Sequence, residues 1–264
     1  MKYLLWLLIT GWLPAAAQHY TDYLDKKNPS QLLDKIRSRQ ATAADSAELQ
    51  QMAIIIQNNG QRIDQEQRQY KKSLASIDSA IILFTVLNDT VNIANNRKYR
   101  GYLLGRLEKY KEAKIEIQAA ADLYSRTGNK AGKAVCQFDL ARMFELQDKI
   151  DSAIYYANIS RDYWKLQGND ARVLITNNMI VNIWLNAHEI EKAGAVYRDS
   201  EQLIKRPGLY WQELIDFYYT SERLFKNMND MATAIRYRGL YEQQIIALQK
   251  QGIRAISYYE MSGQ

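Results

Sequence analysis

The sequence is poor in the residues on which several classes of protein depend. Its 264 residues include one cysteine (Cys136), two histidines, three prolines and twelve glycines. One cysteine excludes an intrachain disulfide, and with two histidines it leaves almost no ligands for a zinc site. So few glycines and prolines do not suit the many turns of a β-sandwich or barrel. We therefore expect a chain held together by its core, with no metal and no cofactor.

Motifs typical of enzymes are also missing. The sequence contains no G-x-S-x-G, no P-loop and no G-x-G-x-x-G. His188-Glu189 begins like the zinc motif H-E-x-x-H, but Lys192 stands where the second histidine belongs. We therefore predict a non-enzymatic protein and interpret His188 as a solvated residue between two helices. Cys136, which has apolar neighbours, is expected to be a small buried residue.

The longest apolar run lies at the N-terminus. Lys2 precedes the apolar stretch 3–13, Pro14 ends it, and three alanines follow up to Ala17. This order is typical of a secretory signal peptide, whereas a membrane span needs about 20 apolar residues. We predict a signal peptide over residues 1–17 that is cleaved after Ala17, and export to the periplasm or the extracellular space. The alternative is a buried N-terminal helix.

Two kinds of residue recur along the chain every 40 positions. One series is Gly128, Gly168 and Gly208. The other is Ala113, Ala153 and Ala193, and Ala234 continues it after 41 positions. Apolar residues at steps of three and four predict first helices over 92–106, 132–146, 172–186 and 212–226. Each second helix should begin just before its alanine, and the first three should end at the glycines, which suit helix C-termini. The sequence thus predicts an all-α solenoid of antiparallel helix pairs.

The rest of the chain is less regular. We expect a loose segment over 18–29, irregular helices with a degenerate repeat over 30–91, four repeats over 92–250, and a short cap or truncated unit over 251–264. Within the irregular part, a helix that starts at Asp45 should end at Asn58–Gly60. A single long helix should follow over 62–87.

The repeats resemble tetratricopeptide repeats in a form with 40-residue units. The family's small residue in the first helix matches Gly101 and Ala141, but Val181 and Glu222 depart from it. Together with the signal peptide, the pattern resembles exported proteins of this family from Bacteroidetes-type bacteria. The resemblance implies a right-handed superhelical solenoid whose first helices line a concave groove that takes a protein or peptide.

The family's concave positions, carried onto this sequence, form the predicted partner-binding set. Its members are Lys98, Tyr102, Arg106, Phe138, Arg142, Asn178, Asn182, Asn186, Tyr219, Arg223 and Lys226. The three asparagines stand four apart on one helix, and their amides can donate to and accept from a peptide backbone. The alternative is a wet face that merely tolerates asparagine. The full Lys/Asn/Lys/Arg set that clamps a terminal carboxylate in this family is not found.

We therefore expect an exported scaffold that binds a protein or peptide, with acidic partners suited to the arginines and lysines. The pI of about 9.1 would suit nucleic acid, but an exported location argues against that partner. Two alternatives stay open. One is the input module of a signalling protein with a shortened C-terminus. The other is a structural subunit of an envelope complex that forms homo-oligomers through its C-terminal unit.

Overall fold

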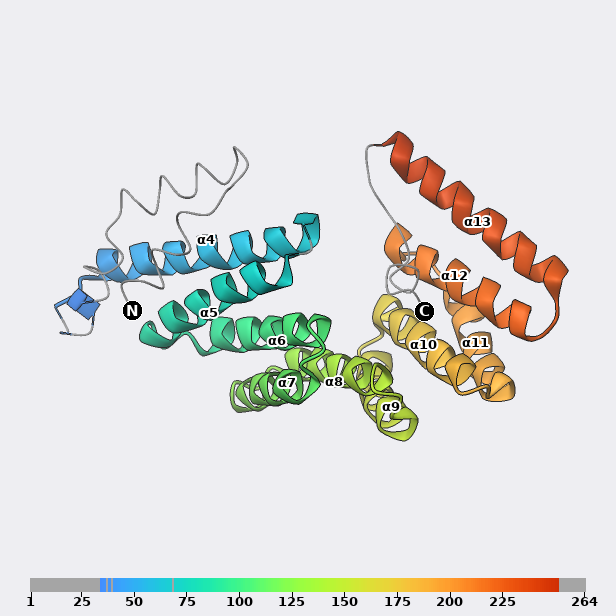
Figure 1. Ribbon diagram of the computed structural model, residues 1–264, viewed down its shortest axis with the longest axis horizontal. Helices are drawn as coiled ribbons and strands as arrows, with labels where there is room; N and C mark the ends of the chain where they lie inside the picture. The colour runs from blue at the N-terminus through green and yellow to red at the C-terminus, as the bar shows by residue number, and fades with distance from the viewer. Residues whose placement is uncertain (1–33, 37, 39, 68, 252–264) are drawn as a thin grey trace. The chain divides into compact units, whose positions relative to one another are not determined.

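The regular structure of the chain is helical. The computed structural model describes residues 34–36, 38, 40–67 and 69–251 (Figure 1). No residue in these ranges belongs to a β-strand. The all-α solenoid class predicted from the sequence is therefore confirmed. The expected signal peptide, the segment 18–29 and the tail 252–264 lie outside the described residues.

The helices follow one another in pairs joined by short turns. In chain order they are α4 (Ala43–Gln67), α5 (Tyr70–Val86), α6 (Thr90–Arg106), α7 (Tyr110–Arg126), α8 (Lys130–Glu145), α9 (Ile150–Leu166), α10 (Asp170–Asn186), α11 (Ile190–Leu203), α12 (Trp211–Asn227) and α13 (Met231–Lys250). The four predicted first helices correspond to α6, α8, α10 and α12, and their ends agree within two residues. Apolar spacing alone was enough to place them.

The turns recur at a constant interval of half a repeat. Seven residues with positive φ, between 54° and 70°, follow the ends of helices: Asn88, Glu108, Gly128, Asp148, Gly168, His188 and Asn229. The eighth, Gly208 with φ 99°, lies in the connection between α11 and α12. Helix α11 ends at Leu203, so the predicted end of this helix at Gly208 is wrong. After α7, for example, the Asn129 N–H returns to the Tyr124 carbonyl at 2.8 Å. Such bonds satisfy the last carbonyls of a helix and reverse the chain. His188 is one of these turn residues and is exposed, as predicted.

The boundary between the first two described long helices differs from the prediction. Helix α4 continues through Gly60 to Gln67, so the predicted end at Asn58–Gly60 and the single helix over 62–87 are wrong. A Cβ atom on Gly60 would lie 2.9 Å from the Ser76 Cβ atom of α5. Glycine at position 60 therefore allows two helices to pack closely and does not stop one.

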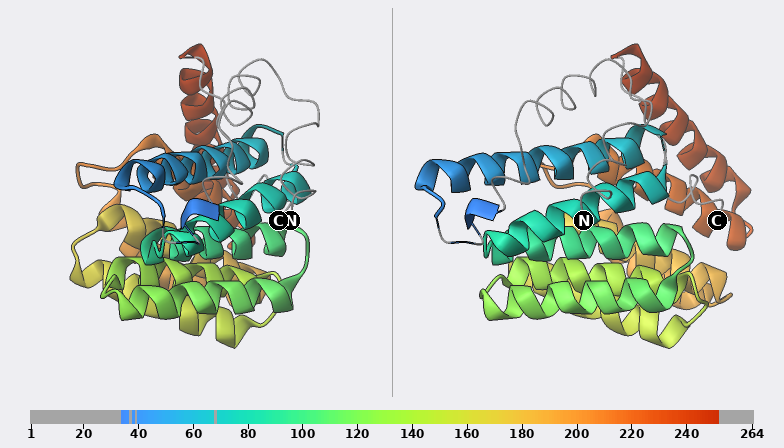
Figure 2. Two further views of the ribbon diagram at one scale, coloured as in Figure 1. Left: turned by 90° about the vertical axis from the view of Figure 1, so that its left-hand side faces the viewer. Right: turned by 60° about the vertical axis from the view of Figure 1, so that its left-hand side comes forward.

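The chain divides into two compact units, Met1–Cys136 and Gln137–Gln264, and the boundary falls within α8. In unit 1, α6 packs along α7 (Figure 2). A Cβ atom on Gly101 would lie only 2.5 Å from Ile117 Cγ1, so this glycine permits the close contact. Leu103, Leu104 and Ile117 are almost fully buried. Cys136 is buried too, which confirms its interpretation as a packing residue.

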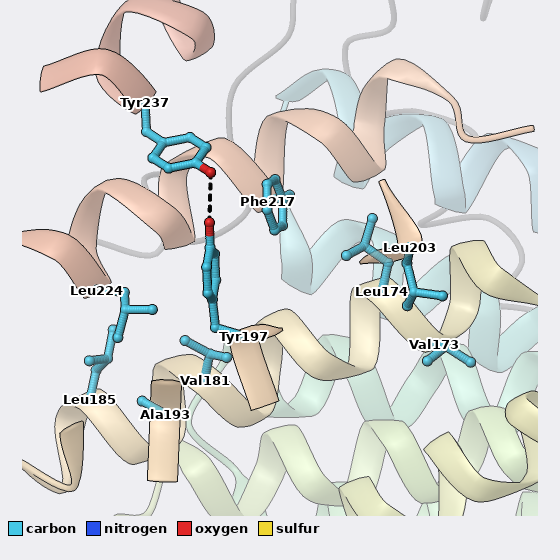
Figure 3. Close-up of a cluster of buried hydrophobic side chains, with 10 residues drawn as sticks. All are labelled: Val173, Leu174, Val181, Leu185, Ala193, Tyr197, Leu203, Phe217, Leu224 and Tyr237. Atoms are coloured by element: carbon cyan, nitrogen blue, oxygen red, sulfur yellow. Dashed lines mark hydrogen bonds between the residues drawn. The ribbon is translucent and has the colours of Figure 1, made fainter. Parts of the chain in front are cut away.

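Unit 2 is built on a core of aliphatic and aromatic side chains from α10 to α13 (Figure 3). Tyr197 of α11 stacks on Phe217 of α12, with ring centroids 5.6 Å apart. The hydroxyls of Tyr197 and Tyr237 share a hydrogen bond of 2.7 Å inside this core, which satisfies both polar ends. Ala193 and Ala234 are fully buried. The recurring alanines therefore lie inside the packed core.

Candidate functional site

The predicted binding residues lie on first helices in both units. Helix α6 of unit 1 carries three of them, and α8, α10 and α12 of unit 2 carry eight. In unit 1, Arg106 donates to the Tyr70 hydroxyl at 3.0 Å and lies over the Tyr70 ring at 5.3 Å. The Tyr102 ring lies 5.6 Å from that of Tyr99. These contacts hold Tyr102 and Arg106 in place, and both are half-buried, as is Lys98.

The asparagine stripe of α10 runs from the interior to the surface. Asn178 and Asn182 are buried, with 2% and 0% of their surface exposed, whereas Asn186 is exposed. The side-chain Nδ2 group of Asn182 donates to the main-chain carbonyl of Asn178 at 2.8 Å and to the Thr220 hydroxyl of α12 at 2.9 Å. Asn182 therefore connects two consecutive first helices, which gives a physical reason for an asparagine inside a helix.

Arg223 of α12 completes this connection. Its guanidinium donates to Asn182 Oδ1 and, through Nη2, to Asn186 Oδ1 at 2.9 Å. The planar fork of arginine suits two acceptors one helical turn apart. Three members of the predicted set are thus brought together across α10 and α12. Asn182 and Arg223 are 41 positions apart in the chain, close to one repeat length.

Sequence reasoning missed Glu145 at the end of α8. Only 6% of its surface is exposed, and its Oε1 atom accepts no hydrogen bond from the described residues. Burial raises the pKa of this carboxyl to about 7, against the opposing influence of the Arg142 and Arg223 charges. A glutamate three residues after Arg142 looks like an ordinary surface residue in the sequence. Only the fold shows that it is enclosed.

Among the predicted binding residues, Asn178 also has a buried polar atom without a hydrogen bond to the described residues. The Asn178 Nδ2 group is buried and donates to none of the described residues. A buried donor or acceptor without a hydrogen bond costs about 1–3 kcal/mol. We call Arg142, Glu145, Asn178, Asn182, Asn186 and Arg223 the first-helix cluster. It contains a buried acceptor and a buried donor without partners among the described residues.

The other predicted residues of unit 2 lie on α8 and α12, two of the helices that carry this cluster. Phe138 packs against the apolar core between α8, α9 and α10. The Tyr219 ring lies 6.0 Å from that of Tyr241 in α13. Lys226 pairs with Glu222 at 2.5 Å, and Arg142 lies 3.9 Å from Asp139. The charges around the cluster are therefore largely balanced.

A pocket of about 380 Å³ lies elsewhere in unit 2, among the ends of α9 and α11 and the start of α10. Its rim contains the ion pairs Lys165–Asp199, at 3.5 Å, and Asp170–Arg206, at 3.0 Å. Its charged groups are already paired, which makes it a weaker candidate than the first-helix cluster. In the described ranges no three His, Cys, Asp or Glu side chains gather as a metal site, and no helix is long and apolar enough to cross a membrane.

The comparisons with known proteins define the class of fold. No family model matches the chain, and no curated protein matches it. Among solved structures it is similar to BtubC (BKLC) from P. vanneervenii, with a TM-score of 0.67 and 13% identity. The match covers 90% of this chain and 93% of that chain. At this identity the likeness shows the fold alone, and it is consistent with a helical-repeat solenoid.

Proposed function

We propose that this chain is an exported, non-enzymatic relative of the tetratricopeptide-repeat proteins that binds a protein or peptide on the first helices of unit 2. The first-helix cluster carries the proposal. It contains a buried carboxylate oxygen and a buried amide without partners among the described residues, beside an arginine fork. Folded proteins pair nearly all of their buried polar groups, so such atoms suit a ligand that supplies the missing bonds. Lys98, Tyr102 and Arg106 offer a second polar surface in unit 1.

The proposed export and family rest on the sequence. The signal-peptide pattern of residues 1–17 supports a periplasmic or extracellular location. The regular succession of helix pairs and the small residue Gly101 support the family. Repeat solenoids create extended concave surfaces, which suit the binding of macromolecules.

The test is affinity capture from an envelope extract of the native cells. We compare the wild type with Asn186→Ala/Arg223→Ala, which alters the cluster at its accessible side. The control, Asp170→Ala/Arg206→Ala, removes an ion pair at the pocket of the same unit. We expect the wild type and the control to capture the same partner protein in similar amounts. The cluster variant should capture at least about tenfold less of it.

Circular dichroism must first show equal helix content in all three proteins. Equal capture by the cluster variant would place binding elsewhere. A wild type that captures no protein would contradict the proposal.

A second candidate function is homo-oligomerisation through α13, which one observation favours. Met231, Ile235 and Ile246 are 53%, 67% and 52% exposed. At 100° per residue they fall within about 60° of one side of the helix. An exposed apolar stripe of this kind suits contact with another protein. Sedimentation equilibrium of the wild type and of Ile235→Glu tests it, because an oligomer through α13 should dissociate in the variant.

A further inference from the structure

The pocket of unit 2 lies where the repeat is interrupted, at the end of α11. Helices α7 and α9 each have 17 residues, whereas α11 has 14 and ends at Leu203. Pro207 gives a reason, because a proline disfavours the helical conformation in the residue before it. Arg206 therefore lies outside the helix, and its side chain reaches Asp170 at the start of α10. The pocket of about 380 Å³ lies beside this contact.

The inner wall of the pocket is apolar. Val173 and Leu203 line it, are 2% and 7% exposed, and belong to the core of unit 2 (Figure 3). Sites for small molecules usually measure about 300–1,000 Å³ and combine an apolar wall with a few polar groups. The pocket is at the lower end of this range. It therefore suits a compact ligand with an apolar part.

Four charged side chains also line the pocket, two of each sign: Lys165, Asp170, Asp199 and Arg206. They are 30% to 59% exposed. Exposed ion pairs contribute little to stability, so a ligand can replace them at a small cost. The Lys165–Asp199 pair, at 3.5 Å, is longer than a good hydrogen bond. Among the described residues, Arg206 donates to Asp170 through Nη1 alone, which leaves N–H groups for another acceptor.

These charges belong to this junction and not to the repeat. Forty positions earlier, where the preceding repeat has its equivalent residues, neither pair exists, because the four positions hold Ser125, Lys130, Ile159 and Leu166. A pair that every repeat needed for its stability would recur in each copy. The two ion pairs therefore call for an explanation particular to this pocket.

The balance of charge selects the chemistry of a ligand. A lone anion would be repelled by two carboxylates, and a lone cation by a lysine and an arginine. A small molecule that carries both charges avoids these costs. Its carboxylate can accept from Arg206, its ammonium group can donate to Asp199, and its apolar part can cover Leu203. The pairing that makes the pocket unsuitable for an acidic partner thus suits a zwitterion.

We propose that this pocket binds a free α-amino acid with an apolar side chain, such as leucine. In an α-amino acid the two charged groups are attached to one carbon atom, next to the side chain. The end of a peptide offers only one of the two charges, so a chain terminus is a poorer match. This binding is independent of the proposed partner surface on the first helices, which involves other residues.

The probe is L-leucine, added to the full chain and followed by amide chemical shifts. Saturable shifts should appear at Gly168 and Gln202, which line the pocket, with a dissociation constant of roughly 0.1–1 mM. N-acetyl-L-leucine lacks the ammonium group, and L-leucinamide lacks the carboxylate. Each should bind at least about tenfold more weakly. Glycine, which has no side chain to cover the apolar wall, should also bind more weakly.

Two variants remove one charge each from the pocket. Arg206→Gln and Asp199→Asn change exposed side chains, so the fold should be retained, and each should weaken leucine binding at least about tenfold. The controls Arg198→Gln and Glu191→Gln change exposed residues of α11 outside the pocket lining and should bind as the wild type does.

The double variant Asp170→Ala/Arg206→Ala separates the two proposed sites, since it should lose leucine and still retain the protein partner. Binding of N-acetyl-L-leucine or L-leucinamide as tight as that of leucine would assign the pocket to a chain terminus and overturn the inference. Shifts remote from the pocket, or pocket variants that bind as the wild type does, would also overturn it. So would the absence of binding by every apolar amino acid up to about 10 mM.

Discussion

At the scale of single residues, Glu145 shows how burial changes the behaviour of an ordinary side chain. Its ordinary pKa of 4.5 is raised to about 7, chiefly by the loss of water around the charge. The folded chain therefore holds a proton more tightly than the unfolded chain between these two values. Free energy of unfolding must then decrease as the pH rises from about 4.5 to about 7, and stay level above. The buried charge destabilises the free protein at neutral and alkaline pH.

Replacing Glu145 with glutamine should remove this destabilisation. At pH 8 we expect Glu145→Gln to unfold with a free energy higher than wild type by roughly 2–3 kcal/mol, since one pKa unit corresponds to about 1.4 kcal/mol. At pH 5 the difference should fall to less than about 1 kcal/mol, because this pH is only slightly above the ordinary pKa of 4.5. Urea unfolding followed by circular dichroism at both pH values measures it, with the exposed Glu191→Gln as control. A gain of equal size at both pH values would show that the carboxyl does not titrate near neutrality.

At the scale of the helix and its turn, the structure uses one solution seven times. A residue in the left-handed region follows each of these seven helix ends, and only Gly128 and Gly168 among them are glycine. The sequence revealed those two, because glycine signals a stop; a residue such as Glu108 gives no such signal. Gly208 suggested a third stop, but α11 ends earlier, at Leu203. Gly60 gave a false signal, since it serves the contact of α4 with α5. Periodicity predicts where helices lie, but the reason for a particular glycine depends on what packs against it.

His188 allows the cost of this turn to be measured. Its φ is 59°, a region that a β-carbon disfavours by about 1–2 kcal/mol. Glycine removes this strain, but it also makes the unfolded chain more flexible, which offsets part of the gain. We therefore expect His188→Gly to raise the free energy of unfolding by about 0.5–1 kcal/mol. The matched opposite is Gly168→Ala, at φ 64° with open space around its Cβ position. It should be less stable by about 1 kcal/mol. Thermal and urea melts that moved both variants in the same direction would contradict this account.

The candidate site was only partly predictable at this scale. The repeat length places Asn182 and Arg223 on equivalent turns of neighbouring first helices, so their meeting follows from the sequence. That Asn178 and Asn182 are buried does not follow, because burial depends on how closely α10 and α12 approach. For the same reason Glu145 could not be told from a surface glutamate.

At the scale of the whole molecule, the division into two compact units suggests that stability is not shared equally along the chain. Contacts in a repeat protein run mainly between neighbouring helices, as between α6 and α7 or α12 and α13. A defect in one unit should therefore weaken that unit first.

A cavity in unit 1 tests this division. Leu103→Ala removes a fully buried side chain of α6 and should cost about 2–5 kcal/mol. Amide hydrogen exchange followed by mass spectrometry should show faster exchange in α5 to α7, and near-normal protection in α10 to α12. Phe217→Ala, which is also fully buried, should give the reverse pattern. Equal loss of protection in both units would indicate a single cooperative structure.

The regular spacing of the turns also limits how such a chain can change in length. One residue inserted within a helix turns the later side chains of that helix by about 100° around its axis, and so moves the buried face out of register with its neighbours. Lengthening by a whole helix pair preserves each face and each left-handed turn. New copies of the α8–α9 or α10–α11 pair could therefore be added or lost as complete blocks. Gene duplication in units of one complete repeat is the route by which this architecture can grow without refolding its neighbours.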